Sequence, residues 1–283
     1  MLNALTIDVE DWWQLVHWKV TGEVVPPSPA VVKETEFILD RLAAYQVRAT
    51  FFVLANVAET FPGLIRRIAD AGHEVASHGL SHTRVYLQSP DTFREETKRA
   101  KRLLEEVAGQ PVRGYRAAEF SVTHRSLWAL DVLAEEDFLY DSSIFPIKGG
   151  RYGIPDVPLR PYRILTNQGS TLVEFPLTAI ERWGRRWPIA GGGYFRLLPY
   201  RLTRAAIQAI NNEGRPAVIY LHPYEFAPER LSVRISRPSL RSYLTYIRHA
   251  GVHNLARARV AARFVSLLRE FEFAPLGELM GCV

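Results

Sequence analysis

Short hydrophobic runs alternate with amphipathic segments along most of this chain. The runs are nearly continuous, and they cover residues 2–7, 47–54, 73–77, 111–116, 138–143, 171–176 and 216–221. Runs of this length and composition are typical of buried parallel strands. Helical spacing of the apolar residues lies between them, at residues 31–45, 61–71, 90–108, 123–136 and 202–211. The alternation predicts repeated β-α-β units, and therefore an α/β barrel or an open parallel sheet.

The pattern changes toward the C-terminus. From Ser239 onward we expect one or two amphipathic helices that carry Arg248, Arg257, Arg259, Arg263 and Arg269. Such helices can lie on an anionic membrane, but they more commonly pack on a protein core with their arginines in water. We therefore predict a barrel domain at residues 1–235 and a basic helical extension at residues 236–283 that packs on it. Peripheral membrane contact is the alternative.

Composition limits the classes to which this protein can belong. With 283 residues, 47% of them hydrophobic, the chain can build one large core. The formal charge of +5 is too diffuse to indicate nucleic-acid binding. The single cysteine, Cys282, excludes an internal disulfide. The first residues enter a strand without a basic segment or a long apolar run, so we expect a cytoplasmic enzyme, either free or at the inner face of the membrane.

Two groups of candidate metal ligands follow predicted strands. Asp8, Glu10 and Asp11 come directly after the first strand, where buried carboxylates are costly without a partner such as a metal ion. Asp11 could instead cap the next helix. His78 and His82 follow the third strand, and their spacing lets both reach one ion if the backbone is helical or tightly turned. Because functional sites of α/β folds lie at this end of the strands, we expect one shared site.

Three further strand ends carry polar side chains. Arg116 ends the fourth strand, where we expect it to orient a carboxylate through a bidentate contact. Asp141 ends the fifth strand and is a candidate for holding a metal-binding histidine in the correct tautomer. His222 follows the last strand. Together with the acids and the histidine pair, these residues indicate a metal site with a general base and a general acid beside it.

Two segments are candidates for substrate contact. The proline- and glycine-rich loop at residues 145–162 is long enough to cover a substrate. The glycines at 191–193 bring the backbone close either to a neighbouring element or to a ligand. In the second case Tyr194 would be an aromatic platform for that ligand.

Four short motifs resemble those of the polysaccharide deacetylase (NodB homology) family, the metal-dependent carbohydrate esterases of family 4. In chain order they are Thr6 to Asp11, His78 to His82, Gly114 to Ala118, and Leu221-His222. The resemblance covers most of residues 1–230. The stretch 222–226 and the arginine-rich tail resemble the branch associated with bacterial exopolysaccharide and exosortase loci. The resemblance implies an α/β fold, a distorted (β/α) barrel of about seven parallel strands with a C-terminal helical extension.

The resemblance also implies roles for individual residues. Asp8 would be the general base, held by Arg116, and His222 the general acid, while His78 and His82 would bind the metal. The family's first motif usually has adjacent aspartates, whereas here Val9 follows Asp8. The metal carboxylate is therefore Glu10, which we favour, or Asp11.

The third motif also departs from the family pattern. Ala118 replaces the usual proline and is followed by Glu119. The backbone N–H expected to stabilise the oxyanion is then that of Glu119 or Phe120.

These residues favour hydrolysis of an amide bond. A divalent ion polarises a carbonyl and acidifies bound water, while a carboxylate takes the proton of that water. Two histidines and a carboxylate suit Zn²⁺, although Co²⁺, Ni²⁺ or Fe²⁺ would also fit. We predict an N-deacetylase of N-acetylhexosamine units in a bacterial exopolysaccharide or its lipid-linked precursor. The alternatives are a related amidohydrolase or deformylase on a small or nucleotide-linked sugar, and an inactive scaffold that binds glycan.

Overall fold

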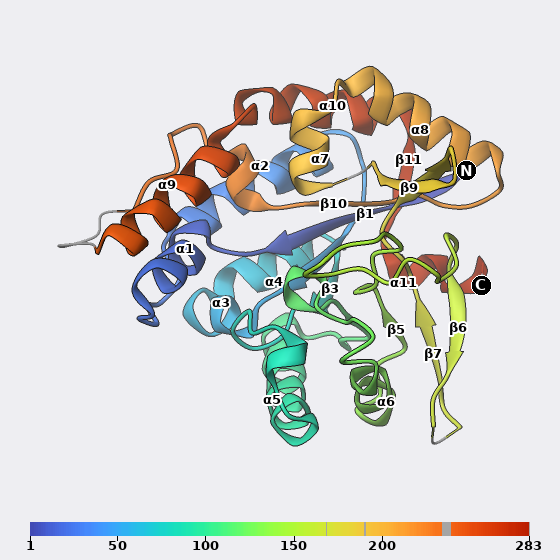
Figure 1. The fold of residues 1–283 in the computed structure, drawn as a ribbon, viewed down its shortest axis with the longest axis horizontal. Coiled ribbons are helices and arrows are strands. Elements are labelled where there is room, and N and C mark those ends of the chain that lie inside the picture. The colour runs from blue at the N-terminus through green and yellow to red at the C-terminus, as the bar shows by residue number, and fades with distance from the viewer. Residues whose placement is uncertain (168, 190, 234–238, 283) are drawn as a thin grey trace.

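One curled, mostly parallel sheet organises the molecule (Figure 1). The computed structural model describes residues 1–167, 169–189, 191–233 and 239–282. The strand order is β10-β1-β2-β3-β4-β5-β7-β6, with the bounds Val218–Leu221, Leu2–Val9, Thr50–Val53, Glu74–Ser77, Gly114–Tyr115, Tyr140–Asp141, Thr171–Glu174 and Tyr162–Leu165. The strands from β10 to β7 are parallel, and β6 is antiparallel to β7. The seven parallel strands confirm the predicted fold class. Among the described strands no pairing joins β6 to β10, so the barrel is open.

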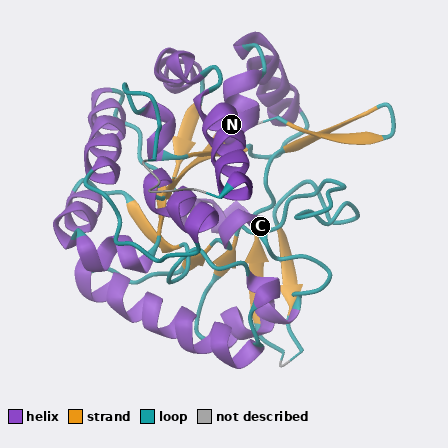
Figure 2. Cartoon of the chain, turned by 60° about the vertical axis from the view of Figure 1, so that its left-hand side comes forward, coloured by secondary structure: helices purple, strands orange, loops and turns teal. Residues whose placement is uncertain are grey.

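Helices connect the strands and cover the sheet (Figure 2). In chain order they are α1 Trp12–Thr21, α2 Ala30–Ala44, α3 Ala55–Thr60, α4 Pro62–Asp70, α5 Pro90–Ala108, α6 Trp128–Glu135, α7 Gly192–Leu197 and α8 Tyr200–Asn212. The longest, α5, shows why the sequence specifies them. The Ser89 side chain caps its first turn, Pro90 occupies the first helical position, and Gly109 ends it in the left-handed conformation. Its apolar residues, including Phe93 and Leu104, are buried.

The C-terminal region is part of the same sheet and core. The short strand β11, Glu272–Ala274, pairs with the start of β1, while β10 pairs with the rest of β1. Helix α10, Val260–Glu270, buries Phe264 against Phe226. Helices α9 (Leu240–Asn254) and α11 (Leu276–Leu279) lie against α1 and β1 respectively. The predicted domain boundary at 235/236 lies outside the described residues.

Several elements were not predicted from the hydrophobic pattern. Helices α1 and α3, strands β6 and β11, and the separate hairpin of β8 (Ala179–Arg182) and β9 (Arg185–Pro188) are all short. Side chains of β6 alternate between partly buried and exposed, and none is fully buried. Edge strands of this kind give a weak hydrophobic pattern in the sequence. No helix among the described residues is long and apolar enough to cross a bilayer.

Gly114 is required by the close approach of two strands. Its register partner Tyr140 is fully buried, and a Cβ at position 114 would lie 2.0 Å from Tyr140 Cζ. We expect Gly114→Ala to lower the free energy of unfolding by about 3 kcal/mol or more, because no rotamer change removes an overlap of this size. Chemical denaturation measures this. Gly63→Ala is the control, since a Cβ there meets nothing within 4 Å. Equal losses in the two variants would contradict the prediction.

Candidate metal centre and active site

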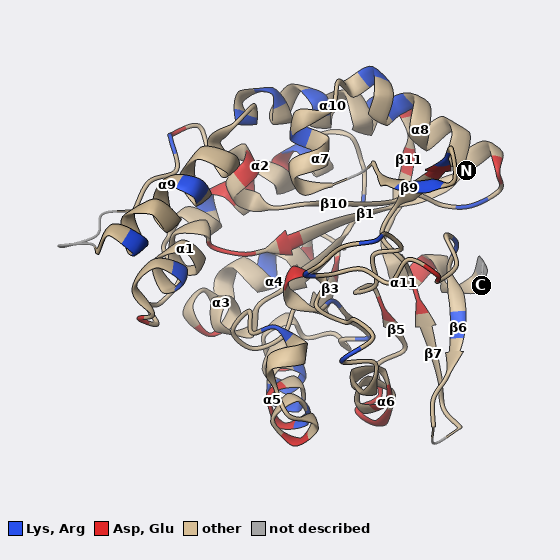
Figure 3. Cartoon of the chain, viewed as in Figure 1, with Lys and Arg blue, Asp and Glu red and all other residues tan. Residues whose placement is uncertain are grey.

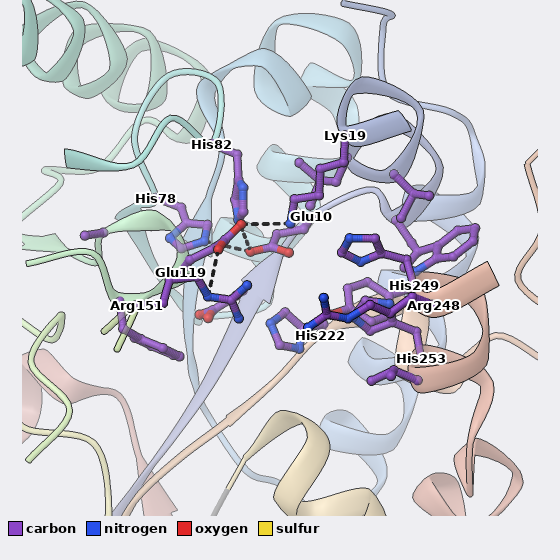
Figure 4. A pocket seen from close by; sticks show the side chains of 18 residues that line it. Glu10, Lys19, His78, His82, Glu119, Arg151, His222, Arg248, His249 and His253 are labelled. Carbon is purple, nitrogen blue, oxygen red and sulfur yellow. Dashed lines mark hydrogen bonds and ion pairs between the residues drawn. The ribbon is translucent and has the colours of Figure 1, made fainter. Parts of the chain in front are cut away.

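Three predicted metal ligands meet at the carboxyl ends of β1 and β3 (Figure 4). Glu10 Oε1 lies 2.9 Å from Nε2 of both His78 and His82. All three side chains are buried, and their ligand atoms lie within 4.8 Å of one another. Two imidazole nitrogens and one carboxylate oxygen form a donor set that a divalent transition metal accepts. The residues present therefore fit a metal ion.

A tight turn, and not a helix, brings the two histidines together. Gly79 and His82 have φ values of 86° and 62°, which reverse the chain directly after β3. The His78 Nδ1 atom lies 2.8 Å from the Arg116 carbonyl oxygen. With its Nδ1 proton donated to that carbonyl, His78 would have the lone pair of Nε2 free for a metal ion bound beside Glu10, as in many metal-binding histidines.

Glu10 has the charge that a cation site needs. Burial raises its pKa, but His82 and His222, and hydrogen bonds from His78 and His82, outweigh burial and hold the pKa well below its usual range. The Glu10 side chain is therefore ionised at neutral pH. A buried carboxylate between two imidazoles is stabilised by shared cationic charge, which protons or a metal ion can supply.

Asp11 faces another part of the molecule, which corrects the expectation that it could ligate the metal. Its carboxylate accepts hydrogen bonds from the backbone N–H groups of Gln14 and Ser28 and from the Ser28 hydroxyl. It is the N-cap of α1, the alternative role considered for it. Of the two carboxylates left open by the sequence, only Glu10 lies with the histidines among the described ligand groups.

Arg116 and Asp8 form a fully buried ion pair. Arg116 Nη1 donates to Asp8 Oδ1 at 2.7 Å and to the Thr6 hydroxyl at 2.7 Å. Its Nε and Nη2 donate to the carbonyl and the hydroxyl of Ser142, and its guanidinium lies 4.1 Å from the Phe52 ring centroid. These contacts fix the Asp8 carboxylate beside Glu10 and His222, with ligand atoms within 4.8 Å of one another.

His222 is the third histidine of the site, and it has its own carboxylate partner. Its Nδ1 lies 3.4 Å from Glu225 Oε2, and Arg196 Nε lies 3.1 Å from Glu225 Oε1. Burial lowers the pKa of His222, but Glu10, Glu225 and Asp8 outweigh burial and raise it to about 9. The imidazole can thus carry a proton at neutral pH. Glu225 and Arg196 were not predicted, although the spacing of His222 and Glu225 is visible in the sequence.

Two family models match different halves of the chain. Residues 26–134 match the model described as polysaccharide deacetylase, and residues 142–281 match a domain of unknown function (DUF3473). The chain carries a polysaccharide deacetylase domain. The histidine pair and Arg116 lie in the first region, and His222 lies in the second. Asp8 and Glu10 precede both.

Curated relatives of the deacetylase domain are named for related activities. A peptidoglycan-N-acetylglucosamine deacetylase of Bacillus cereus is 33% identical over 98 residues, 34% of this chain and 36% of that protein. A chitooligosaccharide deacetylase of Bradyrhizobium is 33% identical over 100 residues, 35% of this chain and 43% of that protein. The matched region thus spans about two fifths of the length of these relatives.

Solved structures show the same fold. A protein of Mycobacterium smegmatis, assigned provisionally as a polysaccharide deacetylase, superposes with a TM-score of 0.64 at 22% identity, covering 100% of this chain and 89% of its own. The Puue allantoinase superposes with a TM-score of 0.62 at 18% identity, covering 98% and 88%. At these identities the likeness concerns the fold alone.

Two of the three predicted substrate-binding residues, Glu119 and Phe120, lie at the site. They line a cavity beside Glu10, and both have positive φ, 53° and 52°. The Phe120 N–H donates to the Ala117 carbonyl at 3.0 Å, so it is already engaged. The Glu119 N–H stays a prediction.

Tyr194 lies outside the residues that line the cavity. Its ring packs edge-on against Phe145, and its hydroxyl lies 3.5 Å from that of Tyr152. A Cβ on Gly191 would lie 2.1 Å from Tyr220 Cδ1, so the glycines admit a neighbouring strand, the alternative considered for them. Likewise Asp141 bonds to Ser143, whose hydroxyl accepts from the Ala117 N–H, and does not touch a metal-site histidine.

A cavity of about 310 Å³ opens beside Glu10, and residues of both halves of the chain line it (Figure 4). Lining residues that were not predicted from the sequence to lie at the site include Lys19, Arg151, Arg248, His249 and His253. Glu119 forms ion pairs with three cations on one side of this cavity. Its carboxylate lies 2.8 Å from Lys19 Nζ, 2.8 Å from Arg84 Nη2 and 3.5 Å from Arg151 Nε.

These ion pairs predict a pH-dependent contribution to stability. Burial raises the pKa of Glu119, but Lys19, then His82 and Arg84, outweigh burial and lower the pKa from 4.5 to about 2. The stabilisation is therefore fully present above pH about 4.5 and is lost as the pH falls toward 2. Glu119→Gln should lower the free energy of unfolding of the metal-free protein by about 1–2 kcal/mol at pH 7, since its partners are partly exposed. The difference should shrink below pH about 4.5.

Urea denaturation from pH 7 to about pH 2.5 measures the difference across the range in which it should be lost. Glu106→Gln is the matched control, because Glu106 is exposed on α5 and has no ion pair among those found between described residues. A Glu119→Gln effect independent of pH, or no larger than that of the control, would contradict the assignment.

Proposed function

We propose that this protein is a metal-dependent N-deacetylase acting on N-acetylhexosamine units of a bacterial exopolysaccharide or its lipid-linked precursor. One observation carries the proposal: Glu10, His78 and His82 converge next to the Asp8–Arg116 pair and His222. The activities named for the curated relatives, on chitooligosaccharide and peptidoglycan N-acetylglucosamine, support this class of substrate.

Glu10, His78 and His82 would hold one divalent ion, for which we expect Zn²⁺, with Co²⁺, Ni²⁺ or Fe²⁺ as alternatives. Bound there, the ion would polarise the acetyl carbonyl and lower the pKa of water. The Arg116 carbonyl beside His78 Nδ1 keeps that imidazole in the tautomer required of a ligand.

Asp8 is the general base of the proposed reaction. It accepts one proton from the attacking water as the water oxygen bonds to the acetyl carbon. Arg116 holds the carboxylate in place, and the Thr6 hydroxyl, which accepts a second hydrogen bond from the same guanidinium nitrogen, helps to orient Arg116. Because the ion pair is fully buried, the carboxylate has little freedom to turn away from the cavity.

His222 is the general acid. It donates its proton to the leaving nitrogen as the C–N bond breaks, so that acetate and a free amine are released. The Glu225 carboxylate accepts a hydrogen bond from His222 Nδ1 and so orients the ring. Arg196 balances the charge of Glu225. The hydrogen bond from Nδ1 to Glu225 favours the protonated form of the ring, which keeps this proton available before the reaction.

Helix α9 lies beside the cavity and favours a second candidate within the same chemistry. Arg248, His249, Val252 and His253 of this helix form one side of the cavity. A cavity of about 310 Å³ with this helix on one side also suits a small substrate, so a related amidohydrolase or deformylase acting on a small or nucleotide-linked sugar is the alternative. A glycan-binding scaffold without turnover is a third outcome of the tests below.

Acetate release tests the proposed reaction. We expect purified protein with bound metal to release acetate from N-acetylglucosamine oligomers, and chelation to abolish release until metal is restored. Asp8→Asn should keep the metal and lower kcat about 100-fold or more, since it removes the base. Full activity of Asp8→Asn would exclude Asp8 as the base. Metal without acetate release favours the small-molecule amidohydrolase, and protein without metal favours the scaffold.

Metal content tests which of the two carboxylates that follow β1, Glu10 or Asp11, binds the metal. Glu10→Gln, like His78→Ala, should lower the metal content sharply, because each removes one of three proposed ligands. Asp11→Asn is the matched control, and it should keep stoichiometric metal and most of its stability, because Asn caps a helix about as well as Asp. Elemental analysis and thermal unfolding measure both effects. Loss of metal from Asp11→Asn with an intact fold would overturn the assignment.

A further inference from the structure

Three cations from separate parts of the chain line the cavity of the proposed active site. Lys19 lies on α1, Arg151 on the loop after β5, and Arg248 on α9. Figure 4 shows their side chains around the space in front of Glu10 and His222. Figure 3 shows basic residues on both α1 and α9, beside the acidic run that follows β1. The cations are therefore gathered from distant sequence positions at one opening.

Neighbouring carboxylates do not balance these cations. Lys19 and Arg151 share the single carboxylate of Glu119 with Arg84. Arg248 has no ion pair among those formed between described residues, and it is exposed at the mouth of the cavity. Asp8 is neutralised by Arg116. With Glu10 matched to the proposed metal ion and Glu119 to its own cations, Arg248 is left at the mouth without a carboxylate partner among the described residues.

Unsatisfied polar atoms lie in the same wall. The Trp12 side chain is 4% exposed, lines the cavity, and has an Nε1–H without a hydrogen-bond partner among the described residues. An indole N–H can only donate, so it requires an acceptor. His253 contacts the Trp12 ring edge-on, and its buried Nδ1 also lacks a partner in this part of the structure. Leaving a buried donor unpaired costs free energy that a ligand oxygen would recover.

The two histidines of α9 are arranged as neutral hydrogen-bonding groups. His249 and His253 stack with ring centroids 5.7 Å apart. Burial, then Lys19 and Arg248, lower the pKa of His249, and burial and Arg196 lower that of His253 to about 4. Both rings are therefore uncharged at neutral pH, and the positive charge of the wall belongs to Arg248 and Lys19.

We propose that the substrate carries an anionic group, a carboxylate or a phosphate, close to its N-acetyl group, and that Arg248 binds this group with Lys19 and Arg151. This inference rests on the proposed function and narrows its substrate class. An oxyanion supplies several acceptor oxygens at once, which suits the guanidinium at the mouth. A neutral N-acetylglucosamine polymer would leave Arg248 without a charged partner.

The test compares oligosaccharides of equal length that differ only in charge. We would measure kcat/KM for acetate release from a neutral N-acetylglucosamine oligomer, from an oligomer that alternates N-acetylglucosamine with glucuronic acid, and from a neutral oligomer with a phosphate at its reducing end. We expect the wild type to prefer one of the anionic oligomers by about 10-fold or more. The preference should fall as NaCl is raised. The two anionic arms distinguish a carboxylate from a phosphate.

Variants of α9 locate the effect. Arg248→Ala should reduce the ratio of kcat/KM for anionic over neutral oligomers about 10-fold, Arg248→Glu should invert the ratio, and Arg248→Lys should retain part of it. Arg241→Ala is the matched control, because Arg241 lies on the same helix and does not line the cavity. An equal ratio in Arg248→Ala and Arg241→Ala, or equal kcat/KM for all three oligomers in the wild type, would overturn the proposal.

A binding measurement keeps this inference separate from the proposed reaction. Calorimetric titration of metal-loaded Asp8→Asn, with and without Arg248→Ala, gives the affinity for each oligomer without turnover. Tighter binding of an anionic oligomer that is lost with Arg248 supports the subsite even if no oligomer is deacetylated. Equal affinity for neutral and anionic oligomers overturns the subsite even if acetate is released.

Discussion

The buried ion pair between Arg116 and Asp8 is the contact on which the site depends. Removing one partner of such a pair leaves an uncompensated charge at a cost of about 3–5 kcal/mol. Arg116 follows β4, Asp8 lies on β1, and Ser142, which binds the guanidinium twice, follows β5. The requirement to satisfy one guanidinium therefore holds three strand ends together. It also holds the Asp8 carboxylate at the cavity, beside Glu10 and His222.

Buried ion pairs also connect the two regions that separate family models match. Glu119 receives Lys19 and Arg84 from the N-terminal half and Arg151 from the C-terminal half. Glu225 lies between His222 and Arg196, both from the second region. Glu119 is thus buried with cations from both halves of the chain beside it, whereas the charges around Glu225 are matched within the second region. The cavity is a property of the whole described chain.

The features that could be predicted from the sequence are those that depend on short stretches of the chain. The seven parallel strands follow from runs of buried residues, and the meeting of Glu10, His78 and His82 follows from the rule that parallel strands end at one edge. The role of Asp11 as a helix cap and the position of Tyr194 depended on which neighbours the fold supplied. Arg248 could not be assigned, since an exposed arginine on an amphipathic helix has the same sequence signature whether it faces water or a cavity. Partners such as Glu225 and Arg196 are 29 residues apart, and only packing unites them.

The pairing of β1 has a consequence for how the chain folds. This strand lies between β2 and two strands from the far end of the sequence, with residues 218–221 on one part and 272–274 on another. During synthesis β1 emerges first, but these neighbours exist only after more than 200 further residues have been made. Long sequence separation slows folding, and an apolar strand with an unpaired edge invites pairing with other chains. The strand that carries Asp8 therefore keeps an edge open to mispairing until β10 and β11 have been made.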